Sequence, residues 1–124
     1  MGMINELSTP FITLILTLFF GFWLSSIGKP YNGILFNLHK LIALGTVILI
    51  GIQVAKLPRT ADALTLIIAL LVVAAICVVA LFVSGALMSA GKLDYALMLT
   101  IHRIAPVVLT ITLALVAYLL WRKV

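Results

Sequence analysis

The chain has 124 residues, of which 65% are hydrophobic and only 9% are charged, whereas soluble domains carry roughly 25% charged residues. This composition excludes a soluble globular enzyme and a disordered chain. The net charge of +5 does not indicate nucleic-acid binding, because the basic residues are scattered in ones and twos and form no stripe. The apolar residues suffice for about four spans of about 20 residues each, so we expect an integral membrane protein.

The first predicted helix covers residues 9–27. It begins near Pro10, which suits the first turn of a helix, and it ends at the turn-forming residues 28–33. Residues 1–7 contain Glu6 and no Lys or Arg, so the basic segment typical of a secretory signal is missing. We therefore expect this helix to be retained.

Three further helices are predicted over residues 34–55, 61–90 and 95–121. Thr60 or Asp62 can cap the helix that begins at residue 61. The connections are short, which forces consecutive helices to be antiparallel. The sequence thus predicts an all-α protein, an up-down four-helix bundle that forms a single transmembrane domain over residues 1–124.

The two halves of the chain, residues 1–60 and 61–124, repeat a pattern of uncommon residues. A shift of 63 positions pairs residues of the same or similar type: Ser26 with Ser89, Gly28 with Gly91, Lys29 with Lys92, His39 with His102, and Lys40 with Arg103. Apolar helices match at Leu and Val by composition, but not readily at Gly, Lys and His together. We therefore expect two similar helical hairpins with the same orientation in the membrane.

His39 and His102 are the paired metal-ligand candidates in an otherwise inert interior. An ionisable residue within the bilayer is costly and by default indicates a functional site. The two residues lie on the order of 8 and 10 Å into their helices, so both imidazoles are expected at nearly the same depth. Their helices are diagonal partners in an up-down bundle, and a diagonal on the order of 11–14 Å suits two imidazoles that bind one metal centre between them.

A haem suits this pair better than another metal does. A porphyrin supplies four nitrogens itself and needs only two axial protein ligands, whereas zinc prefers four ligands and copper usually needs sulfur or a third donor. The three carboxylates Glu6, Asp62 and Asp94 lie near helix ends. The single cysteine, Cys77, excludes a CxxCH haem attachment. We expect one haem b with the two histidines as axial ligands; structural pairing, or proton or substrate handling, are the alternatives.

Basic and small residues surround the predicted site. Four cations ring its open end as candidates to pair with haem propionates: Lys29, Lys92, Lys40 and Arg103. Snorkelling toward lipid headgroups is the alternative for these four. Six small residues lie at comparable depth on the first and third helices: Gly21, Ser25, Ser26, Ser84, Gly85 and Ser89. They can admit a porphyrin edge, or they can simply let helices pack closely.

The segments Leu38-His39-Lys40 and Ile101-His102-Arg103-Ile104-Ala105-Pro106, set in four apolar helices, resemble membrane b-type cytochromes of the cytochrome b561 and related four-helix kinds. Members typically bind two haems through four histidines, and this chain has two histidines. The resemblance therefore implies one haem with His39 and His102 as its ligands, and no second haem.

The predicted function is single-electron transfer by a small membrane cytochrome, an electron-transfer subunit rather than an enzyme with its own acid–base catalyst or nucleophile. A quinol or another redox subunit is the expected partner. The alternatives are a non-redox structural subunit of a larger complex, or a small transporter, although an exporter would be expected to carry a carboxylate within a span.

Charge at the helix ends predicts the orientation. Four basic residues flank the side of the two termini: Lys56, Arg59, Arg122 and Lys123. The opposite turns carry Lys29 and Lys92. The positive-inside rule then predicts cytoplasmic termini in the inner or plasma membrane, with the haem nearer the outer face.

Overall fold

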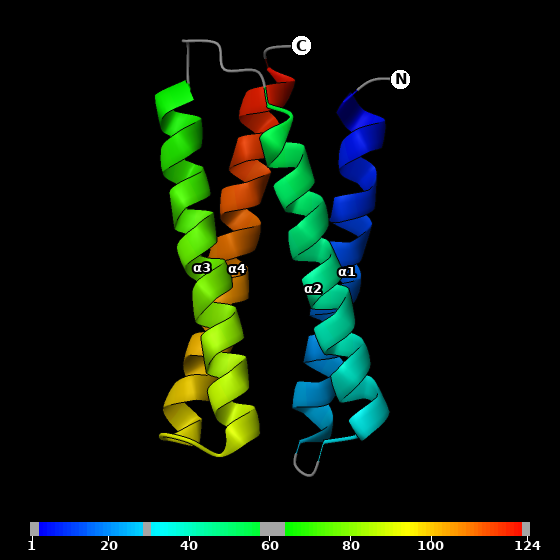
Figure 1. The fold of residues 1–124 in the computed structure, drawn as a ribbon, viewed down its shortest axis with the longest axis vertical. Coiled ribbons are helices and arrows are strands. Elements are labelled where there is room, and N and C mark those ends of the chain that lie inside the picture. Colours follow the sequence, from blue (N-terminus) through cyan, green and yellow to red (C-terminus); the bar gives the residue numbers. More distant parts are fainter. Residues whose placement is uncertain (1–2, 29–30, 58–63, 123–124) are drawn as a thin grey trace. The chain divides into compact units, whose positions relative to one another are not determined.

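The structure is a computed structural model that describes residues 3–28, 31–57 and 64–122. Four helices make up nearly all of these residues: α1 (Met3–Ile27), α2 (Gly33–Ala55), α3 (Leu64–Ala90) and α4 (Tyr95–Trp121) (Figure 1). The described ranges contain no strand. The prediction of an all-α chain with four long helices is therefore confirmed.

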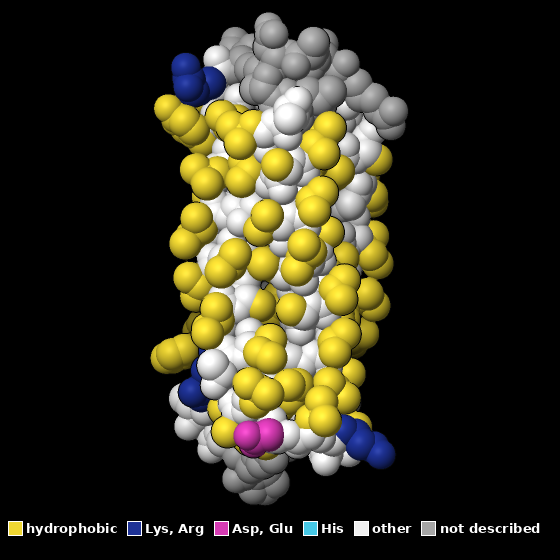
Figure 2. All heavy atoms as spheres, turned by 90° about the vertical axis from the view of Figure 1, so that its left-hand side faces the viewer, with side chains coloured by type: hydrophobic (Ala, Val, Ile, Leu, Met, Phe, Trp, Pro, Cys, Tyr) yellow, Lys and Arg dark blue, Asp and Glu magenta, His cyan; other side chains and the backbone are white. Residues whose placement is uncertain are grey.

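Each of the four helices is long and apolar enough to cross a membrane. Their lengths of 23 to 27 residues exceed the roughly 20 residues that a bilayer requires. Figure 2 shows hydrophobic side chains along the whole length of one face, with charged side chains toward its two ends. By length, composition and surface character, this is an integral membrane protein.

The chain divides into two compact units, Met1–Pro58 and Arg59–Val124. Each unit holds one pair of packed helices (Figure 1), which we name hairpin 1 (α1 and α2) and hairpin 2 (α3 and α4). Only a few residues connect the two helices of a pair, so the helices within each hairpin are antiparallel.

The two hairpins end their first helices in the same way. Gly28 follows α1 with φ +74°, and Gly91 follows α3 with φ +69°. This left-handed conformation is favoured by glycine because it has no Cβ, and it stops a helix while its last carbonyls remain paired. The amide of Gly28 donates to the Leu24 carbonyl at 3.1 Å, and the amide of Lys92 donates to the Leu87 carbonyl at 3.0 Å.

Polar side chains begin the second helix of each hairpin. The Asn32 side chain accepts from the amides of Ile34 and Leu35, and the Asp94 side chain accepts from the amide of Ala96 at 3.1 Å. These N-caps satisfy amides that the first helical turn leaves without an acceptor. The predicted caps of the third helix, Thr60 and Asp62, lie outside the described residues.

The interfaces within the two hairpins differ in polarity. In hairpin 1, the hydroxyls of Thr17 and Thr46 lie 3.2 Å apart across the interface, and Thr46 is only 3% exposed. In hairpin 2, the core is apolar: Ala74 and Cys77 of α3 meet Leu109 of α4, with Val78, Leu81 and Leu113 packed around them. Two threonine hydroxyls therefore meet between α1 and α2, whereas the buried cluster around Ala74, Cys77 and Leu109 between α3 and α4 is apolar.

Thr46→Val should destabilise hairpin 1 slightly, because it removes the hydroxyl that meets Thr17 while the branched shape is retained. Interhelical hydrogen bonds in membranes contribute about 0.6 kcal/mol on average, and we expect a loss of that size in an unfolding titration in mixed detergent micelles. Thr112→Val is the matched control, because the buried Thr112 hydroxyl donates to the Val108 carbonyl of its own helix. Equal losses in the two variants would show that the contact between helices contributes nothing.

Candidate functional site

His39 lies on the face of α2 that packs against α1. Its Nδ1 is 3.0 Å from the backbone oxygen of Thr17. A Cβ built on Gly21 would lie only 2.9 Å from the Cε1 atom of His39, closer than real Cβ contacts. The half-buried imidazole therefore lies directly against the backbone of α1, and a side chain at position 21 would displace the ring.

His102 occupies a similar environment between α4 and α3. Its Nδ1 lies 3.1 Å from the backbone oxygen of Leu81 and 3.0 Å from the hydroxyl of Ser84. A Cβ on Gly85 would lie 3.3 Å from its Cε1 atom, which is tighter than most real contacts. This imidazole too packs against backbone exposed by a glycine.

Both hairpins use the same local arrangement, which we name the carbonyl–glycine pair: the accepting carbonyl comes four residues before the glycine. The pairs are Thr17 with Gly21, and Leu81 with Gly85. Side chains on a helix lean toward its N-terminus and cover the preceding turn. A glycine at this spacing therefore uncovers a carbonyl, whose second lone pair can accept from an imidazole of the neighbouring helix.

This contact fixes the tautomer of each histidine. A backbone carbonyl only accepts hydrogen bonds, so the Nδ1 of His39 and of His102 carries the proton. In a neutral imidazole the lone pair then lies on Nε2. Histidines that bind metals almost always donate their other ring N–H to a carbonyl, a carboxylate or water. In both residues Nε2 is thus the ring nitrogen through which the side chain could hold a metal.

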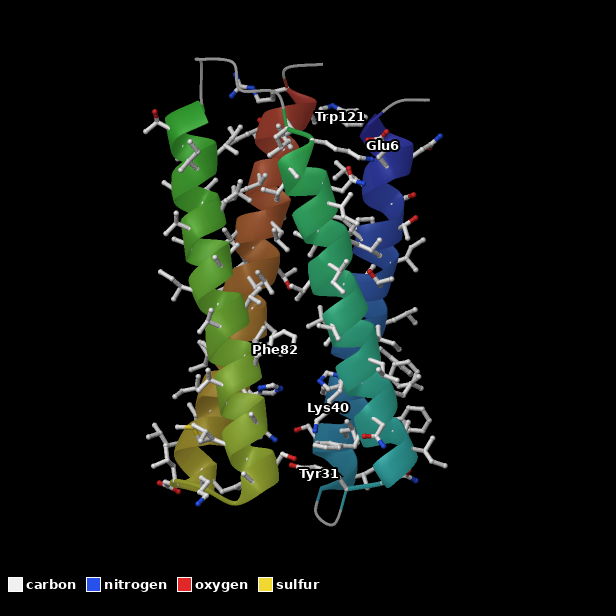
Figure 3. All side chains as sticks on the ribbon, in the orientation of Figure 1. Glu6, Tyr31, Lys40, Phe82 and Trp121 are labelled. Atoms are coloured by element: carbon white, nitrogen blue, oxygen red, sulfur yellow. The ribbon has the colours of Figure 1, made fainter. Side chains whose placement is uncertain are left out.

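The predicted cation Lys40 belongs to an aromatic contact in hairpin 1. Its ammonium lies 4.0 Å from the ring centroid of Phe36, and the Tyr31 ring stacks with Phe36 at 6.0 Å. Figure 3 shows Tyr31 and Lys40 near the end of α2 that follows the turn from α1. A cation–π contact therefore engages Lys40, and its pairing with a propionate stays a prediction.

The remaining predicted cations belong mostly to hairpin 2. Lys92 is exposed in the turn before α4, and Arg103 is exposed on α4 immediately after His102. Lys29 lies outside the described residues. Hairpin 2 thus carries two of the four predicted cations and one of the two histidines. The two histidines belong to different units, so their joint binding of one metal stays a prediction.

Sequence reasoning singled out the glycines but missed what they admit. The sequence allows two roles for Gly21 and Gly85, admission of a porphyrin edge or close packing of helices, and within each hairpin an imidazole packs against the backbone at the glycine. Admission of a porphyrin edge stays a prediction. The accepting carbonyls of Thr17 and Leu81 could not be predicted from residue type alone, because every residue has a backbone carbonyl whatever its side chain. A glycine 17 or 18 residues before a histidine, with a turn between them, is the signal that would have found them.

Among the described residues, no group of three or more His, Cys, Asp or Glu lies close enough to hold a metal ion. No protein-family model matches the chain, no curated protein matches its sequence, and no solved structure matches its fold. The two histidines and the groups that orient them are therefore the features that bear on function.

Proposed function

We propose that the chain is a membrane b-type cytochrome in which His39 and His102 bind one haem through their Nε2 atoms. One observation carries this proposal: in each hairpin, Nδ1 donates to a helix carbonyl that a glycine exposes. This is the orientation that histidines adopt when they bind a metal through Nε2.

The repetition of this arrangement favours ligation over packing. A histidine that only packs in a membrane helix can use either ring nitrogen, and it needs no glycine opposite. Here two histidines at equivalent positions of the repeat use the same nitrogen and the same type of acceptor, and in both hairpins the glycine follows the accepting residue by four positions. Two identical Nε2 donors match the axial requirement of a porphyrin, which supplies the other four nitrogens.

When bound, the haem supplies one-electron chemistry between the ferric and ferrous states. The chain orients two imidazoles, and its apolar helices keep water from the site. With His39 and His102 as its two protein ligands, the haem would supply electron transfer rather than binding of a substrate to iron. Lys92, Arg103, Lys40 and Lys29 are the candidates to pair with the propionates, and Lys40 would exchange its contact with Phe36 for this role.

Absorption spectroscopy tests the proposal. The protein purified from membranes in detergent should show, after dithionite reduction, the sharp α band and Soret shift of a low-spin haem b, at one haem per chain. Haemin added to chains purified without it should produce the same spectrum and saturate at one equivalent. A chain that neither carries haem nor takes it up would instead favour the structural-subunit alternative.

The same absorption band tests partner and orientation. We assign a quinol or another redox subunit as the electron donor, and we place the haem nearer the outer face, with cytoplasmic termini, from the positive-inside rule. A soluble quinol should then reduce the haem, and impermeant ferricyanide should reoxidise it faster in right-side-out than in inverted vesicles. The opposite order would reverse the orientation without affecting the haem assignment.

A further inference from the structure

We propose that Ser84 is a positioning residue that fixes the orientation of His102, and that it makes the two histidine environments unequal. The effect on the imidazole concerns the chain alone, while its consequence for the redox potential rests on the proposed function. The inference comes from three contacts that meet at one point between α3 and α4.

The Ser84 hydroxyl, the Leu81 carbonyl and the His102 ring form a closed triangle. Ser84 donates to the Leu81 oxygen at 3.2 Å, so an oxygen lone pair remains to accept from Nδ1 of His102 at 3.0 Å. The same Nδ1 lies 3.1 Å from the Leu81 oxygen. The imidazole N–H is thus shared between two acceptors, and the sequence from Nδ1–H through the Ser84 hydroxyl to the Leu81 carbonyl is a chain in which hydrogen bonds polarise one another.

Ser84 is placed to act on the ring rather than on the lipid or solvent. It is only 2% exposed, and it is the largest side chain in the described residues that is essentially fully buried. A serine hydroxyl within a helix ordinarily bonds to a preceding carbonyl of its own helix. Here the hydroxyl does so and also contacts a side chain of the neighbouring helix, so its position is fixed from both sides.

Hairpin 1 has no hydroxyl at the position that corresponds to Ser84. The two carbonyl–glycine pairs are related by a shift of 64, one more than the shift that aligns the histidines, so the residue that corresponds to Ser84 is Phe20, which has no hydroxyl. His39 meets the bare backbone at Gly21, with its Nδ1 on the Thr17 carbonyl. The repeat therefore keeps the carbonyl–glycine pair in both hairpins and adds a hydroxyl acceptor in one.

An additional acceptor on Nδ1–H has two physical effects. It restricts rotation of the ring, and it raises the basicity of the opposite nitrogen. In a metal-bound histidine, a more basic ligand stabilises the oxidised metal. Ser84 should therefore slow exchange of the His102 N–H with water and, when haem is bound, lower the midpoint potential.

Ser84→Ala tests this inference, with Ser89→Ala as the matched control because Ser89 is exposed on the same helix. The readout is solvent exchange of the Nδ1 proton, followed by nitrogen-15 NMR of the full chain in micelles. Chains that carry haem are measured in the diamagnetic ferrous state. With only two histidines in the sequence, His39→Gln assigns the His102 signal.

We expect Ser84→Ala to accelerate exchange at His102 by about tenfold, the loss of one buried hydrogen bond, and to leave His39 and the Ser89→Ala control unchanged. Ser84→Thr, which keeps the hydroxyl, should restore slow exchange. Wild-type exchange in Ser84→Ala, or equal acceleration at both histidines, would overturn the inference. Exchange of the His102 Nδ1 proton that is as fast in Ser84→Thr as in Ser84→Ala would also overturn the inference.

In haem-loaded protein, the midpoint potential should rise in Ser84→Ala and stay at the wild-type value in Thr65→Ala, which removes an exposed hydroxyl of the same helix that is not among the candidate haem contacts. A potential that does not move would overturn the electronic part of the inference. If the chain binds no haem, the proposed function fails, while the exchange measurement on the same protein still decides the role of Ser84. The two failures are thus distinguishable.

Discussion

His39→Ala and His102→Ala should each abolish the low-spin haem spectrum of the purified protein. Each substitution removes one of the two Nε2 donors, and a single imidazole leaves one axial position to water. Loss of an outer-shell partner alone costs 10–100-fold in metal affinity, so loss of a ligand should lower haem affinity by at least about 100-fold. Haem content per chain and the position of the Soret band measure the effect.

Asn37→Ala and Thr100→Ala are the matched controls for these two substitutions. The two residues lie two positions before each histidine, are related by the same shift of 63, and are exposed. Both variants should keep one haem per chain with a wild-type spectrum. If either histidine variant retains a normal low-spin spectrum, that histidine is not an axial ligand.

Gly21→Ala should weaken haem binding without weakening the fold. The new Cβ would lie 2.9 Å from Cε1 of His39, so the ring must rotate away and lose the contact between its Nδ1 and the Thr17 carbonyl. We expect haem affinity to fall by about 10–100-fold, the cost of losing an orienting partner. Alanine is a better helix former than glycine by about 1 kcal/mol, so stability in detergent should be unchanged or higher.

Lower haem affinity together with unchanged or higher stability in Gly21→Ala would distinguish a binding defect from a folding defect. Gly85→Ala should have a smaller effect, because its Cβ would lie 3.3 Å from Cε1 of His102. Gly45→Ala and Gly51→Ala are controls within α2, where a Cβ would meet no atom within 4 Å. Haemin titration and thermal unfolding of the five proteins, wild type included, provide the comparison. Equal haem affinity in Gly21→Ala and Gly45→Ala would show that the carbonyl–glycine pair does not orient His39.

The helices could be predicted closely because membrane spans leave strong signals. The ends of all four, Ile27, Ala55, Ala90 and Trp121, agree with the predicted ends, since turn residues interrupt the apolar runs there. The start of α1 differs: it begins at Met3 rather than residue 9. Polar residues such as Asn5 and Glu6 mark the limit of the apolar stretch, but they do not prevent helix formation before it.

The site could be predicted only in part. The histidines stand out because ionisable residues are rare in apolar helices. Their acceptors do not, since a carbonyl is present at every residue and only the fold decides which one is uncovered. The contact of Lys40 with Phe36 could in principle be predicted from the i, i+4 spacing of the two residues. The sequence gives equal reason, however, to expect that Lys40 snorkels toward lipid headgroups or pairs with a propionate.

The paired glycines that end α1 and α3 also set the position of each histidine. Gly28 precedes His39 by 11 residues, and Gly91 precedes His102 by the same number. Both glycines have the same left-handed conformation. In each hairpin the histidine therefore reaches the interface between the two helices after the same number of residues. One residue added or removed within the helical part of that length, between Gly33 and His39 or between Tyr95 and His102, would rotate the imidazole by about 100° around its helix, away from the carbonyl opposite. The length of chain between each glycine and its histidine therefore determines, together with the surrounding side chains, where the imidazole lies.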